Sequence, residues 1–495
     1  MAKRQMSTFE RLKRGERISR RDRRQVEARL LREDPGLEIV HTNVAGVDVG
    51  NKSHFVAVDP RVSDPSVREF GSWTQDLHAM ADWLKECGVQ RVVMQTTGVY
   101  WIAVQDVLEK AGLEVAVVDA RGTRSLPGRK SDVQECQWIR KLDIYGLLRK
   151  SFQVPETNRA IRTIWRVRQR WVRDCGRSIQ RIQKALTTMN VQLANTISDV
   201  TGKSGLAILR AILEGERNPW VLARLCDDRI QASEEEVAHS LQGNWREDVL
   251  FELRQMVEAY DFQQRQIASC DQQLEKYMKA QATQTKFEKT VEDRPVEPSP
   301  KKRGRKKSAA PKPRKNQPTF ALESELARLM GVDLTRIDGI SVMTAQTIYA
   351  ELGSDLSAFP TENHFASWLS LAPKRDVSGG KVIKHRSLPS SNRVANALRM
   401  SAESLSHSHS YLGARYRSLR GRLSGLKAVK AMARYLACLV YRMLTKGEQW
   451  VDRGAQHFEQ KKHVRELNHL QRKARSFGLQ LIPAEELMQK NQHAS

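Results

Sequence analysis

The stretch from Val44 to Asp59 most constrains the fold, because it contains two short apolar segments joined by a polar turn. Segments of this length, rich in Val and Ala and separated by Gly, Asn and Ser, predict two consecutive β-strands. Asp48 lies inside the first segment, and a carboxylate among apolar neighbours is costly to bury unless it is paired or binds a cation. Asp48 therefore either binds a cation, caps the turn or pairs with a nearby lysine.

The residues that follow predict an α/β domain over 41–155. After strands at 44–50 and 54–59, the pattern predicts strands at 67–74, 91–96 and 114–119, and helices at 76–87, 99–110 and 132–149. This succession is that of an RNase H-like domain, in which acids from strand one, the end of strand four and the last helix meet at one sheet edge. These places hold Asp48, Gln95, Asp132 and Glu135.

These four residues are the predicted catalytic residues. The i, i+3 spacing of Asp132 and Glu135 puts both on one helical face. Gathered carboxylates repel one another unless cations neutralise them, and oxygen ligands select Mg²⁺ or Mn²⁺ over Zn²⁺. Two such ions serve phosphodiester cleavage. The sequence therefore predicts a metal site at Asp48, Asp132 and Glu135.

The charge of the chain restricts its partners. Lys and Arg number 83 against 57 Asp and Glu, a net charge of +26, which indicates a polyanionic partner such as nucleic acid. No apolar run approaches the roughly 18 residues of a membrane-spanning helix, and the basic N-terminus leads into no apolar signal core. No membrane partner is therefore expected, and the protein should be intracellular. The six cysteines show no C-x-x-C spacing, which argues against a zinc site or a disulfide framework.

Several separated motifs carry a family resemblance. They are Gly46-Val47-Asp48-Val49, Thr97-Gly98-Val99-Tyr100-Trp101, Ala120-Arg121 and Pro127-Gly128-Arg129-Lys130-Ser131-Asp132. In their order and spacing they resemble the RuvC-like DEDD domain of a family of bacterial insertion-sequence transposases, which includes the Piv invertase and the bridge-RNA-guided recombinases. The resemblance implies that Asp48, Gln95, Asp132 and Glu135 occupy the first to fourth acid positions.

Two of these positions depart from the family pattern. Glu135 replaces Asp and keeps the charge, whereas Gln95 replaces Glu and keeps only a carbonyl oxygen for a metal. Asp119, where the family more often has Asn, is expected either to compensate as a metal ligand or to pair with Arg121 or Arg124.

Residues 156–279 predict a long helical region. The segments 159–200 and 246–278 carry apolar residues at steps of three and four, which is typical of a coiled coil, most simply an antiparallel one. Trp165, Trp171 and several arginines make its first turns basic and aromatic. These side chains form either core and solvated face or a surface for RNA, DNA or a partner helix.

Two basic segments flank these parts. Residues 1–40 form a basic N-terminal arm with a predicted helix at 20–32, which is either simply solvated or lies on phosphates. Residues 280–318 are rich in Pro and Lys and predict a disordered basic linker. Within it, Arg303 and Arg305 resemble the core of an AT-hook, which enters a narrow minor groove. A generic basic tether is the alternative.

Residues 319–450 predict a mainly helical C-terminal domain, followed by a charged helical tail at 451–495. Ile337 to Ile348 resembles a helix-hairpin-helix, whose turn offers amides to phosphates. Leu371 to Lys381 resembles the serine domain of the same transposase family and puts Ser378 at its nucleophile position. Two glycines after Ser378 allow close approach of a phosphate, although a Ser-Gly-Gly turn without chemistry is the alternative. The cations expected to neutralise developing charge include Lys374, Arg375 and Lys381.

Taken together, the resemblance implies a DNA transposase or site-specific recombinase that forms a covalent phosphoserine–DNA intermediate and uses Mg²⁺ or Mn²⁺. The implied partners are the element ends and target DNA, a structured guide RNA and further copies of the chain in a dimer or tetramer. The implied location is the bacterial cytoplasm, at the nucleoid. Arg121, Arg129 and Lys130 are further expected nucleic-acid contacts. The alternatives are a metal-dependent RNase H-like nuclease without serine chemistry and an inactive nucleic-acid-binding relic.

Overall fold

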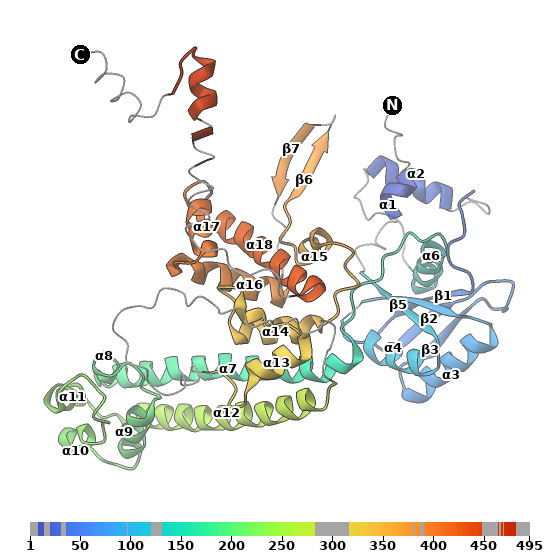
Figure 1. Cartoon of the computed structure of the whole chain (residues 1–495). Helices are drawn as coiled ribbons and strands as arrows, with labels where there is room; N and C mark the ends of the chain where they lie inside the picture. The colour runs from blue at the N-terminus through green and yellow to red at the C-terminus, as the bar shows by residue number, and fades with distance from the viewer. Residues whose placement is uncertain are drawn as a thin grey trace, which may run out of the picture. The chain divides into compact units, whose positions relative to one another are not determined.

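The computed structural model describes residues 8–13, 20–30, 36–96, 98–119, 131–282, 316–378, 381–386, 391–447, 464, 467–468 and 470–481. Two compact units divide the chain, unit one at Met1–Gln153 and unit two at Val154–Ser495 (Figure 1). Some predicted positions lie outside the described residues, namely Arg121, Arg124, Arg129, Lys130, Arg303 and Arg305. No helix among the described residues is long and apolar enough to cross a membrane.

A mixed five-stranded sheet of order β3-β2-β1-β4-β5 forms the centre of unit one. The strands are β1 (Val44–Val49), β2 (Ser53–Ala57), β3 (Val67–Gly71), β4 (Arg91–Gln95) and β5 (Glu114–Val118). β1 pairs antiparallel with β2 and β2 with β3, whereas β4 runs parallel to both β1 and β5. This is the strand arrangement expected of an RNase H-like domain, so the α/β prediction for this part of the chain is confirmed.

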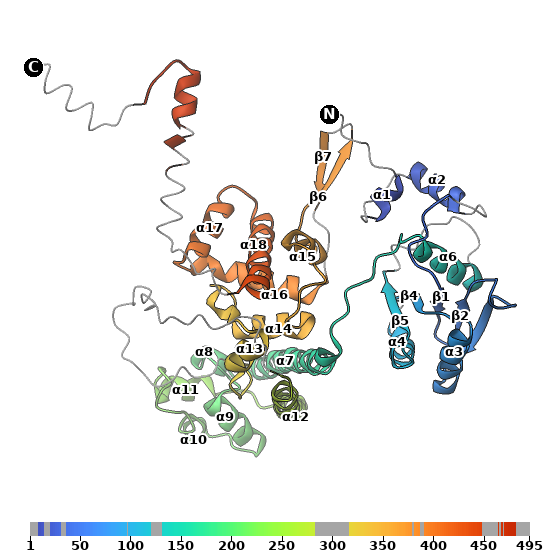
Figure 2. The same ribbon diagram turned by 45° about the vertical axis from the view of Figure 1, so that its right-hand side comes forward.

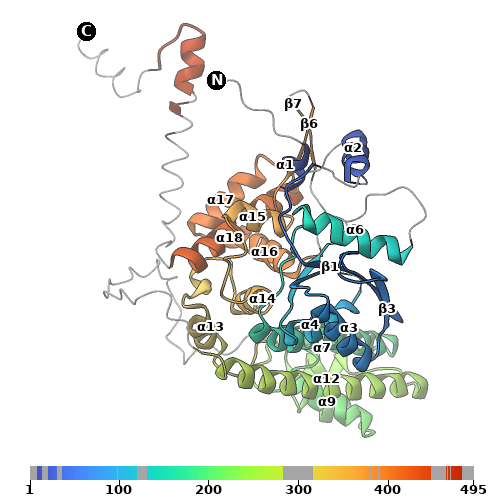
Figure 3. The same cartoon turned by 90° about the vertical axis from the view of Figure 1, so that its right-hand side faces the viewer.

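Helices cover both faces of the sheet. α3 (Thr74–Glu86) and α4 (Trp101–Lys110) lie on one face and α6 (Asp132–Ile144) on the other (Figure 3). Strand alternation explains the division: Val47 packs in the core under α3 and α4, whereas Val44 and Val93 pack with Ile139 of α6. Because β1 and β4 are buried on both faces, their sequences are almost continuously apolar.

α6 is shorter than predicted, because the helix expected to reach residue 149 ends at Ile144. Gly146 adopts a left-handed φ of 63°, and the Leu147 amide turns back to donate to the Leu142 carbonyl at 3.0 Å. Glycine reaches this conformation without steric cost, so the helix ends there.

The basic N-terminal segment contains two short helices, α1 (Thr8–Lys13) and α2 (Arg20–Leu30). α2 packs on α6 within unit one, since Val26 and Leu30 are buried against Trp138 and Leu142 of α6. This packing leaves the arginine-rich face of α2 at the surface.

Unit two begins with two long helices, α7 (Glu156–Thr188) and α12 (Glu247–Lys279), which lie side by side (Figure 1). They are antiparallel, since Arg168 pairs with Asp271 while Ser178, farther along α7, pairs with Gln263, earlier on α12. The prediction that the first helix extends to residue 200 was wrong. Asn190 has a left-handed φ of 57°, and the Val191 amide donates to the Leu186 carbonyl at 2.9 Å, which ends the helix.

Shorter helices complete unit two. The insert between the long helices holds α8 (Leu193–Thr196), α9 (Lys203–Leu213), α10 (Pro219–Ala223) and α11 (Glu234–Ser240). The C-terminal part holds α13 (Leu322–Met330), η1 (Leu334–Arg336), α14 (Val342–Leu352), α15 (Glu362–Trp368), α16 (Arg393–Ser404), η2 (Leu405–His407), α17 (Tyr411–Arg420) and α18 (Gly425–Lys446). The expectation of a mainly helical C-terminal part is confirmed.

A β-hairpin interrupts these helices and was not predicted. β6 (Lys374–Ser378) and β7 (Lys381–Arg386) pair antiparallel and project from α15 and α16 (Figure 2). A Gly-Gly pair between two strands is a strong signal for a two-residue hairpin, and it is present at 379–380. The two glycines themselves lie outside the described residues.

Candidate active site

Strand register brings the first two predicted catalytic residues together. β1 and β4 run parallel with Val47 opposite Met94, so the next residues, Asp48 and Gln95, are neighbours at the same sheet edge. Asp48 is half-buried and Gln95 is only 4% exposed. The sheet therefore places one carboxylate and one amide side by side where the parallel strands end.

Gly46 allows α6 to approach β1 closely. A Cβ at this glycine would lie 2.2 Å from the Cys136 carbonyl oxygen and 2.6 Å from the Arg140 nitrogen, both in the backbone of α6. Side chains two residues apart on a strand share a face, so Asp48 is on the same face as Gly46. Arg140 also donates from Nε to the Val44 carbonyl at 3.0 Å. α6 thus runs antiparallel to β1, and its first turn lies beside Asp48.

The first turn of α6 carries the other two predicted residues. Ser131 caps the helix by accepting a hydrogen bond from the Gln134 amide at 3.3 Å, and Asp132 and Glu135 follow within that turn. The Gln95 side chain donates from Nε2 to Glu135 Oε1 at 2.7 Å. The buried amide of Gln95 is thereby satisfied and holds one oxygen of Glu135 in place.

The same acids affect the pKa of the Cys136 thiol. Burial is the main cause that raises the pKa of this thiol to about 12, and the negative charges of Asp48 and Asp132 contribute to the same rise. Both carboxylates therefore lie near this buried thiol. With such a pKa, Cys136 stays protonated at neutral pH and is no candidate nucleophile.

Ion pairs fix the rest of α6 against the sheet. Arg140 donates from Nη2 to Asp59 Oδ2 at 2.9 Å, and Asp143, which is fully buried, accepts from Arg91 Nε at 2.7 Å. A hydrogen bond from Arg61 is the main cause that holds the pKa of Asp59 well below its ordinary value. Sequence reasoning missed these contacts and the role of Gly46, although a glycine two residues before an acid in a buried strand indicates close packing on the face that carries the acid.

Asp119 follows β5 at this edge. Val118, the last residue of the strand, packs on the α6 face. Asp119 is exposed. Its role as a metal ligand stays a prediction.

The residues at this edge fit a divalent cation in kind. Asp48, Asp132 and Glu135 offer carboxylate oxygens, and Gln95 offers one amide oxygen, the donor type that Mg²⁺ and Mn²⁺ prefer. In the described part of the chain, no three acidic, histidine or cysteine side chains lie close enough together to hold a metal ion.

Ser378 is the last residue of β6 and lies directly opposite Lys381 of β7. The backbone therefore places the predicted nucleophile beside the hairpin turn. The side chains of Lys374, Arg375, Ser378 and Lys381 lie outside the described part of the structure.

The predicted helix-hairpin-helix corresponds to η1, a turn and α14. Gly339 in the turn has a left-handed φ of 89°, and Ser341 caps α14 by accepting a hydrogen bond from the Thr344 amide at 3.2 Å. The cap explains why serine is suitable where a second glycine was expected. Asp338 of the turn accepts hydrogen bonds from Ser408 and Ser410, so the turn is tied to the segment before α17. Phosphate binding by this turn stays a prediction.

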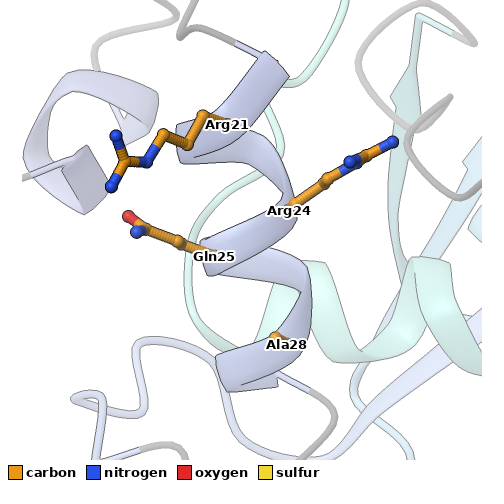
Figure 4. A pocket seen from close by; sticks show the side chains of 4 residues that line it. All are labelled: Arg21, Arg24, Gln25 and Ala28. Carbon is orange, nitrogen blue, oxygen red and sulfur yellow. The ribbon is translucent and has the colours of Figure 1, made fainter.

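A surface hollow of about 370 Å³ on α2 is separate from the catalytic residues. Its lining residues are Arg21, Arg24, Gln25 and Ala28. Figure 4 shows Arg21 and Gln25 extending to one side of the helix and Arg24 to the other. The hollow contains cations and no acid, so it suits an anion better than a metal ion.

An RNase H-like sheet with acids at the ends of β1 and α6 is the fold and site of an enzyme that acts on nucleic-acid phosphodiesters. Comparison with protein families agrees with this class. Residues 45–191 match a family model for the DEDD domain of IS110 elements, described as transposase, and residues 332–417 match one described as transposase of the IS116/IS110/IS902 family. No curated protein matches the chain.

The two matches cover the sheet domain with all of α7, and the region from η1 to most of α17. The chain thus contains two regions that are similar to the domains of IS110-type transposases, and these similarities support the enzymatic activity of a DNA transposase or recombinase. A DEDD transposase domain implies dependence on a divalent metal ion, and a transposase implies DNA as partner.

Proposed function

We propose that this transposase excises and inserts a mobile element with two sets of residues, the acids at the sheet edge of unit one and Ser378 of the hairpin. The observation that carries the proposal is the convergence of Asp48, Gln95 and the first turn of α6 at one edge of the sheet. That edge is where the family domain is expected to hold its acids.

The acids of unit one would bind a divalent ion, and neighbouring residues hold these acids in position. A divalent ion bound by Asp48, Asp132 and Glu135 would stabilise the charge that develops on the scissile phosphate. Gln95 orients Glu135 through its hydrogen bond, and Gly46 keeps α6 close enough for Asp132 and Glu135 to act with Asp48. Arg140 and Arg91 hold α6 in this position.

Ser378 supplies the nucleophile. Its hydroxyl oxygen attacks a phosphodiester, a new P–O bond to serine forms, and one bridging P–O bond to the DNA breaks. The serine proton passes to a base or to solvent, and the leaving DNA oxygen takes up a proton as a free hydroxyl. Attack of another strand's hydroxyl on the phosphoserine reverses these changes and joins the strands. The two glycines that follow Ser378 in the sequence support this role, because glycine allows a backbone to approach a phosphate closely.

Three further properties belong to the same proposal. A structured guide RNA selects the DNA, the chain acts as a dimer or tetramer, and the protein works at the nucleoid in the bacterial cytoplasm. The net charge of +26 supports two nucleic-acid partners. The projecting hairpin supports an oligomer, because a projecting segment can reach a neighbouring subunit (Figure 2).

The first test uses Asp48→Asn and Asp132→Asn in a strand-transfer assay with guide RNA and element DNA. Each change should lower the rate by about 10²-fold or more while the fold and DNA affinity persist, because each removes a charge that acts on the reacting phosphate. Asp82→Asn, an exposed acid on α3, is the matched control and should react like the unmodified chain. Full activity of either site variant would refute the assignment of the acids.

Ser378→Ala separates serine chemistry from a nuclease that uses the acids alone. The proposal predicts loss of strand transfer and of cleavage. Cleavage that continues in Ser378→Ala would leave the metal-dependent nuclease as the function. If the unmodified chain shows no metal-dependent reaction, the remaining function is that of an inactive protein that binds nucleic acid.

A further inference from the structure

Arginines gather around one buried carboxylate where α7 meets α14 and α16. Glu351 of α14 is 7% exposed and accepts hydrogen bonds from Arg166 Nε and NH2 at 2.8 and 2.7 Å and from Arg162 Nε at 3.1 Å. Arg393 Nε lies 3.7 Å from the same carboxylate, and Arg393 NH1 donates to Gln169 at 3.2 Å. One negative charge is thus shared by three guanidinium groups.

Two more arginines extend this group along α7. Arg170 and Arg173 are exposed, and their charges, with that of Arg166, lower the pKa of Arg393, whose largest cause of lowering is burial. We name Arg162, Arg166, Arg170, Arg173 and Arg393 the Glu351 arginine cluster. Its five cations exceed the single charge of Glu351.

A neighbouring arginine shows what a purely structural arrangement looks like on this helix. Arg168 is buried between α7 and α12 and meets its own carboxylate, Asp271, with Nε at 2.5 Å from Oδ1. That pair is balanced one to one. The Glu351 arginine cluster is not balanced in this way, because its positive charges outnumber the charge of Glu351. Like charges at helical spacings of three and four destabilise a helix unless an anion lies between them.

The cluster is also accessible. The side chains of Arg162, Arg166 and Arg393 are 32%, 36% and 38% exposed, so they are partly open to solvent, whereas Glu351 is buried. Trp165 Nε1 and Gln169 Nε2 donate to Thr347 Oγ1 at 3.2 and 3.3 Å and hold α14 on α7. Glu351 and the arginines of α7 are therefore held in fixed positions relative to one another.

We propose that the Glu351 arginine cluster binds phosphodiester groups of a nucleic-acid backbone. Guanidinium groups bind phosphate oxygens in pairs, and Glu351 holds the side chains of Arg162 and Arg166 in place through hydrogen bonds. Arg393 begins α16, shortly after the hairpin of Ser378 in the chain, so a strand held here is held by the same part of unit two that contains Ser378. This inference rests on the proposed function only in taking nucleic acid as the partner.

The test measures the salt dependence of binding by the full chain. Fluorescence anisotropy follows a labelled DNA duplex and, separately, a labelled RNA duplex from about 50 to 200 mM salt in EDTA, so that no strand is cut. The double variant R170Q/R173Q should bind more weakly, and the slope of log affinity against log salt should fall by about 0.9 for each lost DNA phosphate contact.

The matched control is R224Q/R229Q, which removes the same charge from the insert of unit two. Arg224 and Arg229 are exposed, and each already pairs with a carboxylate, Glu234 and Asp227. A second site variant, R393Q, tests the cluster from another helix. Weaker binding of the DNA duplex, the RNA duplex or both supports the proposal and shows which nucleic-acid backbone the cluster binds. Salt-dependence slopes equal to those of the control variant with both duplexes overturn it.

The outcome is independent of the proposed function. If the slope of log affinity against log salt falls in R170Q/R173Q but the unmodified chain never transfers strands, the cluster proposal stands and the strand-transfer proposal is refuted. A chain that transfers strands normally, with an unchanged slope in both site variants, refutes the cluster alone.

Discussion

Gly46→Ala tests whether close contact between β1 and α6 sets the geometry of the site. The added Cβ would lie 2.2 Å from the Cys136 carbonyl oxygen, where ordinary contact begins at 3.4 Å. Backbone atoms of α6 cannot rotate away, so the helix must recede by about 1 Å. Asp132 and Glu135 move with it, away from Asp48 and Gln95.

Two magnitudes follow. Overpacking of this kind costs about 1–3 kcal/mol of unfolding free energy. A displacement of about 1 Å in a reacting site lowers a rate by roughly 10²-fold. We therefore expect a moderate loss of stability and a much larger loss of strand cleavage.

Urea unfolding and a strand-cleavage assay on the full chain measure both effects. Gly176→Ala is the matched control, because a Cβ at this exposed position of α7 meets nothing within 4 Å. It should gain about 0.5–1 kcal/mol, since alanine is the better helix former, and keep full activity. Gly46→Ala with unchanged stability and rate would refute the packing argument.

Three further changes have defined outcomes. Asp271→Asn leaves the buried charge of Arg168 without its partner, so the free energy of unfolding should fall by about 3–5 kcal/mol in urea titrations; a loss below 1 kcal/mol would contradict this. Gln95→Glu replaces the donor to Glu135 by a second carboxylate, so Mn²⁺ should raise the melting temperature more than in the unmodified chain; equal shifts would place Gln95 away from the metal. The pKa of Glu362 is lowered mainly by a hydrogen bond from Arg442 on α18. Its contribution to stability is present above the ordinary carboxyl pKa and is lost as pH falls through the lowered value. Glu362→Gln should therefore lose less stability than the unmodified chain between neutral and acidic pH in urea titrations; identical pH profiles would contradict the assignment.

Local patterns predicted most of the sheet domain. β1 and β4 are apolar on both faces and their order with the helices follows an RNase H-like succession, so the positions of Asp48, Gln95, Asp132 and Glu135 could be predicted. Their mutual contacts could not, because the hydrogen bond from Gln95 to Glu135 depends on how closely α6 approaches β1.

Helix ends and the hairpin show a second limit. Gly146 and Asn190 end α6 and α7 through left-handed backbone conformations, which apolar periodicity does not register. The Gly-Gly pair after Ser378 was interpreted either as space for a phosphate or as a turn without chemistry, but the strands β6 and β7 on its two sides were not predicted.

Contacts between distant segments were the least predictable. Arg162 and Arg166 of α7 meet Glu351 of α14, which is far away in sequence, and no local pattern joins them. The arginines on α7 were noticed as a basic stretch, but which of them are structural depends on the partners that the fold supplies. Arg168 proved to be buried against Asp271.

The most direct test of the proposed chemistry is to trap the reaction on a suicide DNA substrate in the presence of guide RNA and digest the complex for mass spectrometry. The account predicts a peptide containing Ser378 covalently linked to a DNA end, and its disappearance in Ser378→Ala. Cleavage of the substrate without any adduct, unchanged in Ser378→Ala, would contradict it.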